Sequence, residues 1–147
     1  MLLIAWHSQS GTSAALAAAA RAGARDEGDV LLRRCWDIGA RDVLGASALL
    51  LVGAENSGRL AGGAKDLLDR IFYPLCEAQY TIPYALLISA GNDGRGAVEE
   101  ARRIFRGIPF TEALEPRIIR GALTEAGVKE ARELGAAFAA GLSMGIF

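Results

Sequence analysis

The sequence has very few residues of the kinds that bind metals or form disulfides. It contains only two cysteines, Cys35 and Cys76, which lie far apart, and a single histidine, His7. Neither a disulfide framework nor a zinc site can be assembled from these residues. We therefore expect two reduced thiols, no bound metal and a cytoplasmic protein.

The sequence also lacks an excess of charge of either sign. Sixteen Lys and Arg residues face seventeen Asp and Glu residues, which gives a net charge of -1. A protein without a strong positive field has no general attraction for nucleic acid or for an anionic membrane. We expect neither as a partner.

Long hydrophobic runs are missing as well, although 52% of the residues are hydrophobic. The longest apolar stretches, residues 46–54 and 84–90, are far shorter than the roughly 20 residues that cross a bilayer. The opening residues, MLLIAWHSQSG, have neither the basic segment nor the cleavage pattern of a secretory signal. We expect residues 1–147 to form one domain around a single sizeable core.

The chain does contain a regular alternation of strand-like and helix-like segments. Apolar runs predict five strands, at residues 2–6, 29–35, 48–54, 84–90 and 116–121. Segments with helical propensity or spacing lie between them, beginning with the alanine-rich stretch that follows the first strand. With no repeats and no linker, this alternation predicts the α/β class, a doubly wound parallel sheet with helices on both faces.

Two of the predicted helices have specific features. Pro74 is expected to end or kink the helix after the third strand near Phe72. The last helix is expected to begin with Thr124 as its N-cap, with Glu125 in its first turn. Its predicted buried stripe comprises Val128, Ala131, Gly135, Phe138 and Leu142.

Three strand-to-helix loops are rich in Gly, Ser and Asn, namely residues 8–13, 54–63 and 90–96. One such loop is an ordinary turn composition. Three of them at the carboxyl ends of parallel strands, where doubly wound sheets bind ligands, predict a binding site.

The first loop has four hydroxyl residues and one glycine but no Lys or Arg. A P-loop requires the sequence G-x-x-x-x-G-K-[ST], and a Rossmann loop requires G-x-G-x-x-G at this point; neither is present. A helix N-terminus can bind a phosphate with its free N–H groups alone. The loop therefore predicts a single terminal phosphate, as in a phosphomonoester cofactor.

Two segments carry a resemblance to a known superfamily. WHSQSGTS, with Trp6 in the place of a tyrosine, resembles the FMN phosphate loop of flavodoxin-like proteins. ENSGRLAGGAKDLLDR resembles the flavin-ring loop and the following K-x-x-x-D-[RQW] helix of FMN-dependent reductases, and ARELGAAFAAGL resembles their closing helix. The resemblance covers nearly the whole chain and implies a flavodoxin-like sheet of five strands in the order 2-1-3-4-5, with FMN at its edge.

The resemblance and the three loops together define a candidate cofactor site. The phosphate is expected in the first loop and the ring between the other two, with Asn56 at the polar edge of the flavin and Arg59 offering positive charge to the reduced ring. Neither ring loop contains the stacking aromatic that is common in the superfamily. The candidate residues are Ser8, Gln9, Ser10, Gly11, Thr12, Ser13, Glu55, Asn56, Ser57, Gly58, Arg59, Ala90, Gly91, Asn92 and Gly94.

Other polar residues have simpler interpretations. His7 either contacts the flavin or substrate or merely ends the first strand, and the sequence leaves both open. Lys65, Asp69 and Arg70 lie on one predicted helix, where Lys65 and Asp69 at i and i+4 form a surface pair. We interpret these three as structural.

CWDIGAR, residues 35–41, matches the C-x-x-x-x-x-R phosphate cradle of tyrosine phosphatases. In small phosphatases of similar fold that loop follows the first strand and consists of small residues. Here it follows the second strand and contains the bulky Trp36 and Ile38, so we interpret the match as coincidence. Receiver domains are excluded because no acids cluster after the first strand.

These observations favour an FMN-binding NAD(P)H-dependent oxidoreductase that reduces free flavin, a quinone or a similar small acceptor, with no catalytic side chain because the cofactors carry the chemistry. The alternatives are a flavodoxin-type one-electron carrier to a partner protein and a degenerate flavodoxin-like interaction module. The cosubstrate is either NADH or NADPH. The apolar residues after the last helix, AGLSMGIF, favour a homodimer or a higher homo-oligomer.

Overall fold

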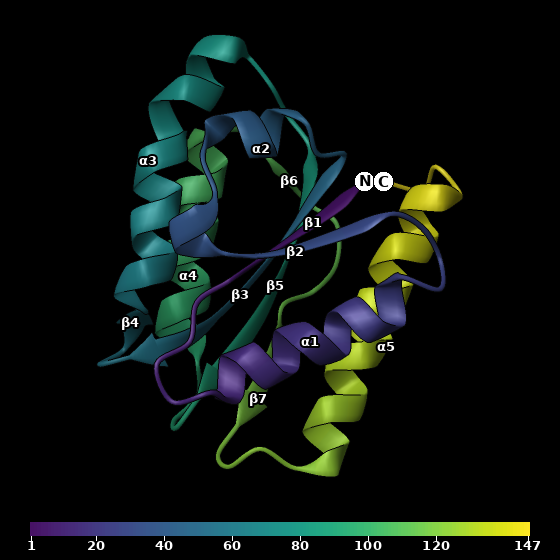
Figure 1. Cartoon of the computed structure of the whole chain (residues 1–147). Coiled ribbons are helices and arrows are strands. Elements are labelled where there is room, and N and C mark those ends of the chain that lie inside the picture. The colour runs from purple at the N-terminus through teal and green to yellow at the C-terminus, as the bar shows by residue number, and fades with distance from the viewer.

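One sheet of seven strands organises the molecule, and the computed structural model describes all of residues 1–147 (Figure 1). The strands β2 (Val30–Arg34), β1 (Leu2–Trp6), β3 (Ala48–Asn56) and β5 (Pro83–Ala90) lie side by side in that order, and β7 (Arg117–Arg120) pairs with the end of β5. All of these pairs are parallel. The predicted order 2-1-3-4-5 is confirmed, with β5 and β7 as the fourth and fifth predicted strands.

Two short strands complete the sheet. The antiparallel partner of β3 is β4 (Arg59–Leu60), which forms a hairpin with it, and β6 (Thr111–Glu112) pairs with the start of β5. Neither was expected from the sequence, because two residues carry no strand pattern of their own.

Helices cover both faces of the sheet, as predicted for a doubly wound domain (Figure 1). One face packs against α1 (Thr12–Ala24) and α5 (Glu125–Ser143), the other against α3 (Gly62–Ala78) and α4 (Arg95–Gly107). The short α2 (Ala40–Leu44) contacts α3 and follows a single 3-10 turn, Cys35–Asp37. The Thr124 hydroxyl accepts a hydrogen bond from the Gly127 N–H at 3.1 Å, which confirms the predicted N-cap of α5.

The strands bury side chains on both faces because residues alternate along an extended chain. In β1, Leu3 and Ala5 belong to the core on the α3 side, whereas Leu2 and Ile4 belong to the core on the α1 side. The two apolar cores contain 24 and 16 buried residues. This explains why β1, β3 and β5 are continuous apolar runs rather than alternating ones.

Glycines let α1 and α5 come into backbone contact. A Cβ atom at Gly23 of α1 would overlap the carbonyl oxygen of Arg132, and one at Gly135 of α5 would overlap that of Ala20. Each helix thus supplies one glycine to the crossing, and the many alanines of α1 fill the rest of a narrow interface. The close backbone contacts at these two glycines fix the position of α1 relative to α5.

Two outcomes were expected at Pro74, an end or a kink of the α3 helix near Phe72, and of these the end is wrong. The helix continues through Pro74 to Ala78. Pro74 lies on the exposed side of α3, where water can bond the carbonyl that its missing N–H leaves free, whereas Ile71 and Leu75 on the other side are fully buried. Burial of that apolar face keeps the helix intact.

The predicted stripe of α5 is wrong at one position, because Val128 is 37% exposed. Leu134, which was not in the stripe, is buried, and Leu142 is half-buried against the core. The observed buried stripe of α5 therefore begins at Ala131 and includes Leu134, so it is rotated by a fraction of a turn from the predicted stripe. None of the helices is long and apolar enough to cross a membrane.

Candidate functional site

The loop between β1 and α1 presents an uncapped helix N-terminus. Gly11 precedes the first helical residue with φ of 103°, a left-handed conformation that favours glycine, and its N–H donates to the Ser8 hydroxyl at 3.0 Å. No side chain caps α1, and no carboxylate lies in its first turn. The free N–H groups and the positive end of the helix dipole therefore remain available to an anion.

The hydroxyls of this loop divide into two groups. Ser10 is exposed, and Ser8 and Thr12 are half-buried, so all three can turn toward a ligand at the helix N-terminus. Ser13, also a predicted phosphate ligand, is 2% exposed, and its hydroxyl oxygen lies 2.9 Å from that of Ser89 in β5. The Ser13 side chain therefore joins α1 to the sheet and does not reach the loop surface.

The second predicted loop, residues 54–63, is for the most part a β-hairpin. Glu55 pairs with Leu60 and Asn56 with Arg59, and the turn residues Ser57 and Gly58 have φ of 50° and 74°. Positive φ at both central positions is the geometry of a two-residue type I′ turn. A loop was expected over these residues; most of them instead form this hairpin, and α3 begins directly after it, at Gly62.

The hairpin is attached to the start of α4. The Glu55 carboxylate accepts a hydrogen bond from the Ala97 N–H at 3.3 Å, and the Leu60 N–H donates to the Glu100 carboxylate at 2.7 Å. A Cβ atom at Gly96 would overlap the carbonyl oxygen of Gly58. The hairpin and the first turn of α4 therefore touch at Gly58 and Gly96, and the Glu55 carboxylate is already engaged with the N-terminus of α4.

The structure brings the first loop and the hairpin together through Gln9 and Asn56. The Asn56 side-chain N–H donates to the Gln9 amide oxygen at 2.6 Å, although the two residues lie 47 positions apart. Ser57 and Arg59 are exposed beside them. This contact holds the polar edge of the hairpin against the first loop.

The third loop spans residues 91–94, between β5 and α4. Gly91 and Asn92 are exposed, whereas Ala90 is buried at the end of the strand. Gly94 is buried, with φ of 71°, and a Cβ there would lie 2.7 Å from a methyl group of Ile118. Of the predicted residues in this loop, Gly91 and Asn92 are the two that a ligand can reach.

The charged residues of α3 form the structural contacts that the sequence predicted. Lys65 and Asp69 form an exposed ion pair at 2.6 Å. Arg70 pairs with Asp66 at 2.7 Å and donates to the carbonyl oxygens of Cys35 and Ile38. Arg70 thus holds the segment after β2 against α3.

An aromatic group that the sequence interpretation missed lies beside the first loop. Trp36 is 58% exposed, and its ring meets His7 edge to face at a centroid distance of 5.6 Å. A Cβ atom at Gly63 would overlap the His7 ring, so His7 packs between Trp36 and the start of α3. The only signal for this group in the sequence was a tryptophan directly after an edge strand, where side chains are often exposed.

The phosphatase alternative fails on burial. The Cys35 side chain is fully buried, and burial raises the pKa of its thiol to about 12. A nucleophilic cysteine needs an accessible thiolate with a lowered pKa. This segment presents the carbonyl oxygens of Cys35 and Ile38 to Arg70, whereas a phosphate cradle presents N–H donors to the phosphate.

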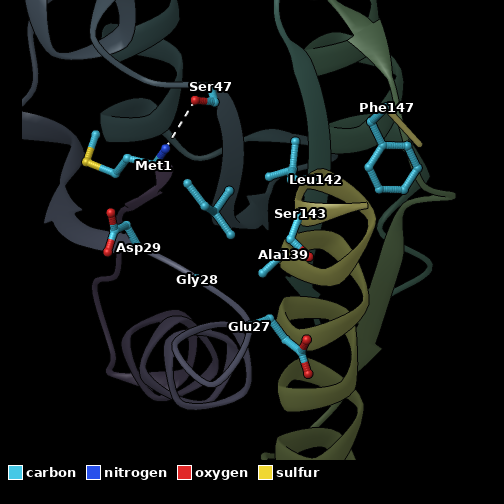
Figure 2. A pocket seen from close by; sticks show the side chains of 10 residues that line it. Met1, Glu27, Gly28, Asp29, Ser47, Ala139, Leu142, Ser143 and Phe147 are labelled. Carbon is cyan, nitrogen blue, oxygen red and sulfur yellow. Dashed lines mark hydrogen bonds between the residues drawn. The ribbon is translucent and has the colours of Figure 1, made fainter. Parts of the chain in front are cut away.

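Two further hollows lie away from the first loop. A groove of about 820 Å³ beside the hairpin is lined by the cations Arg59, Lys65, Arg103 and Arg106 and by the carboxylates Glu99 and Glu100, and none of these three arginines forms an ion pair. A cavity of about 340 Å³ lies at the opposite edge of the sheet, between the start of β1 and the end of α5 (Figure 2). There the Met1 amino group donates to the Ser47 hydroxyl at 3.1 Å, and no predicted site residue lines the cavity (Figure 2).

No family model and no curated protein matches the sequence. Solved structures do match. A flavodoxin from the domain Archaea has a TM-score of 0.84 at 18% identity, over 97% of this chain and 98% of that one. A flavodoxin, WrbA-like protein from Agrobacterium tumefaciens has a TM-score of 0.80 at 14% identity, over 98% and 97% of the two chains.

A flavodiiron protein gives a third match. The Flv1 flavodiiron core from Synechocystis sp. PCC6803 has a TM-score of 0.79 at 18% identity, over 98% of this chain but 36% of that one. Identities this low establish the fold and leave the function to the site. The chain has the flavodoxin-like fold.

Proposed function

We propose that residues 1–147 form one FMN-binding domain that acts as an NAD(P)H-dependent oxidoreductase on free flavin, a quinone or a similar small acceptor. One observation carries the proposal: an uncapped, acid-free helix N-terminus behind Gly11, at the carboxyl edge of a flavodoxin-like sheet. The structures similar in fold include proteins named flavodoxins, and a helix N-terminus of this kind binds phosphate with its free N–H groups.

The residues of the first loop fit a phosphomonoester. The free N–H groups at the start of α1, with the hydroxyls of Ser8, Ser10 and Thr12, supply donors around one end of the loop. The Ser8 oxygen already accepts from Gly11, which leaves its O–H free to donate to the phosphate. A triphosphate would lack the cation that its outer groups require.

The ring is proposed to lie over the exposed parts of the hairpin and the third loop. Because Gly58 and Gly96 are in contact, the ring cannot enter between them and is placed nearer Asn56 and Asn92. The Asn56–Gln9 bond holds one amide toward this space. FMN itself would supply the hydride-accepting chemistry, so the chain needs only to bind and orient.

Two measurements test the proposal. Titration of the protein into FMN is expected to quench flavin fluorescence at one FMN per chain. Anaerobic stopped flow of the FMN-loaded protein is expected to show rapid bleaching of the flavin band by NADH or NADPH. Absence of both quenching and a thermal shift with FMN would reject the cofactor and favour a flavodoxin-like interaction module.

A second candidate function, one-electron transfer to a partner protein, is favoured by the groove beside the hairpin. Its unpaired Arg59, Arg103 and Arg106 would attract an acidic redox protein toward the ring loops. An FMN-loaded protein that neither nicotinamide reduces, and whose redox titration shows two well-separated one-electron steps, would favour this carrier over the oxidoreductase.

We also propose a symmetric homo-oligomer. Phe147 folds back onto α5, with its ring 5.7 Å from that of Phe138, but Met144 and Ile146 remain 66% and 65% exposed. Exposed apolar side chains grouped at one end of a helix are typical of an interaction surface, and a second copy of the same chain would bury them in a symmetric interface.

A further inference from the structure

A small aromatic and cationic pocket lies next to the phosphate loop and has no part in the site proposed above except through Ser8. Its volume is about 100 Å³, and its walls are Trp6, His7, Ser8, Arg34 and Trp36. Both tryptophans and the only histidine of the chain are gathered here. Such a grouping is uncommon on a surface with few aromatics, and it provides a flat apolar face beside a positive charge.

The exposed tryptophan is held in place from three sides. Arg70 donates to the carbonyl oxygens of Cys35 and Ile38, on either side of Trp36, and so fixes the backbone that carries it. The His7 ring lies edge to face against Trp36 and is itself packed on Gly63. A large apolar ring that is 58% exposed and anchored at its backbone can stack on a planar ligand at a reduced entropic cost.

Arg34 provides an uncompensated positive charge in the same pocket. Its guanidinium carbon lies 5.9 Å from the centre of the Trp6 ring, and it forms no ion pair. The preceding Arg33, by contrast, is neutralised by Asp42 at 2.9 Å. The pocket therefore combines a stacking face with a free guanidinium, which suits an aromatic base that carries phosphate.

The position of the pocket along the sheet edge matches the length of a dinucleotide. Trp36 follows β2, and the proposed ring position lies between the ends of β3 and β5. Strands are spaced by about 4.8 Å, so two and a half spacings separate the two positions by roughly 12 Å. An extended dinucleotide can reach across this distance with one base at each end.

We infer that Trp36 and Arg34 bind the adenosine diphosphate half of the nicotinamide cosubstrate, with adenine stacked on Trp36 and a phosphate on Arg34. The inference rests on the proposed NAD(P)H-dependent function and assigns the end of the cosubstrate that is remote from the flavin. Trp36 and Arg34 are binding residues in this scheme, and neither takes part in hydride transfer.

The inference is tested with ADP and adenosine as probes, titrated calorimetrically into the full chain with and without FMN. ADP is expected to bind more tightly than adenosine, because Arg34 contacts only the phosphates. Trp36→Leu is expected to weaken ADP binding about tenfold or more, since a base on an aromatic ring contributes this much. Trp36→Phe retains a smaller face and is expected to restore part of the affinity.

Charge is tested by a matched pair of variants. Arg34→Gln is expected to reduce the affinity for ADP to that for adenosine, whereas Arg41→Gln removes an equally exposed arginine of α2 that lies outside the pocket and is expected to change nothing. Equal losses in the two variants would mean that only overall charge matters and would overturn the inference. So would ADP affinity that is unchanged in Trp36→Leu, or no binding of ADP at all.

The two proposals fail in different ways. If FMN binds and is bleached by NAD(P)H but ADP affinity is independent of Trp36, the site assignment is overturned and the oxidoreductase stands. If ADP binds through Trp36 and Arg34 but neither nicotinamide bleaches the flavin, an adenine-nucleotide site stands, but the oxidoreductase and the assignment of that site to its cosubstrate are overturned. FMN quenching measured on every variant shows that the flavin site is intact.

Discussion

The hydroxyl oxygens of Ser13 and Ser89 lie 2.9 Å apart in the interior and join the first turn of α1 to the end of β5. Loss of one partner leaves the other as a buried hydroxyl without a hydrogen bond, which costs about 1–3 kcal/mol. Ser13→Ala is therefore expected to lower the free energy of unfolding by this amount, measured by urea denaturation. The double variant Ser13→Ala, Ser89→Ala is expected to recover part of the loss.

Ser10→Ala is the matched control for that pair. Ser10 is exposed in the same loop and has no intramolecular partner, so its removal is expected to leave stability unchanged and to weaken FMN binding instead. Equal effects of Ser10→Ala and Ser13→Ala on FMN affinity would contradict the division of this loop into ligand-facing and interior hydroxyls.

Gly11→Val is expected to abolish tight FMN binding. A β-branched residue at φ of 103° is strained by about 1–3 kcal/mol, and relief of the strain rotates the amides that face the phosphate. Gly28→Val, in an exposed turn without positive φ, is the control and is expected to retain binding. Fluorescence titration of FMN against both proteins checks this; wild-type affinity in Gly11→Val would exclude the loop as the phosphate site.

Gly96→Ala is expected to displace the hairpin from α4. The new methyl group overlaps the Gly58 carbonyl, and relief of the overlap stretches the Glu55 contact with the Ala97 N–H, at a cost of about 1–3 kcal/mol. Gly62→Ala, at an exposed first position of α3 with open space around it, is expected to be neutral or slightly stabilising. Thermal unfolding of the two variants tests this, and equal melting temperatures would mean that the hairpin moves away from α4 without loss of stability.

Cys35 is expected to make stability fall in alkaline solution. Burial raises the pKa of its thiol from 9.0 to about 12, so between these values the folded chain binds more protons than the unfolded chain. The free energy of unfolding then decreases by up to about 1.4 kcal/mol per pH unit from this group. Burial also raises the pKa of Tyr84, which acts in the same direction. Urea denaturation from pH 8 to 11 should show a shallower slope for Cys35→Ala, and identical slopes would contradict the burial of this thiol.

The exposed apolar side chains after α5 are expected to mediate self-association. Ile146→Asp combined with Met144→Asp places charges where a second copy would pack, and light scattering at micromolar concentration is expected to shift from an oligomeric mass to the monomer mass. Tyr73→Asp, on the exposed side of α3, is the control for an equally exposed apolar residue elsewhere. A wild-type protein that already scatters as a monomer would reject the oligomer.

The strands and helices could be predicted because their signals are local. β1, β3 and β5 are continuous apolar runs, and Thr124 precedes α5 as a capping residue should. The strand order required the resemblance of WHSQSGTS and the neighbouring segments to flavodoxin-like proteins, since no local pattern specifies which strands are neighbours.

What could not be predicted depends on residues distant in the chain. No local pattern predicts that the Ser13 hydroxyl meets that of Ser89, 76 positions away, in the interior. Gly58 and Gly96 belong to different predicted loops, and no local pattern shows that they form one contact between the hairpin and α4. Trp36 appeared only as an obstacle to a phosphate cradle, because its exposure depends on the clamp that Arg70 forms from α3.

The glycine crossing of α1 and α5 links the phosphate loop to the far end of the chain. Because the two backbones touch at Gly23 and Gly135, α1 cannot open without leaving α5, and their amide protons should exchange with solvent as one cooperative unit. A ligand held at the first turn of α1 would then slow exchange throughout α5, which it never contacts. The exchange rates of the α5 amides would therefore report whether a cofactor is bound at α1.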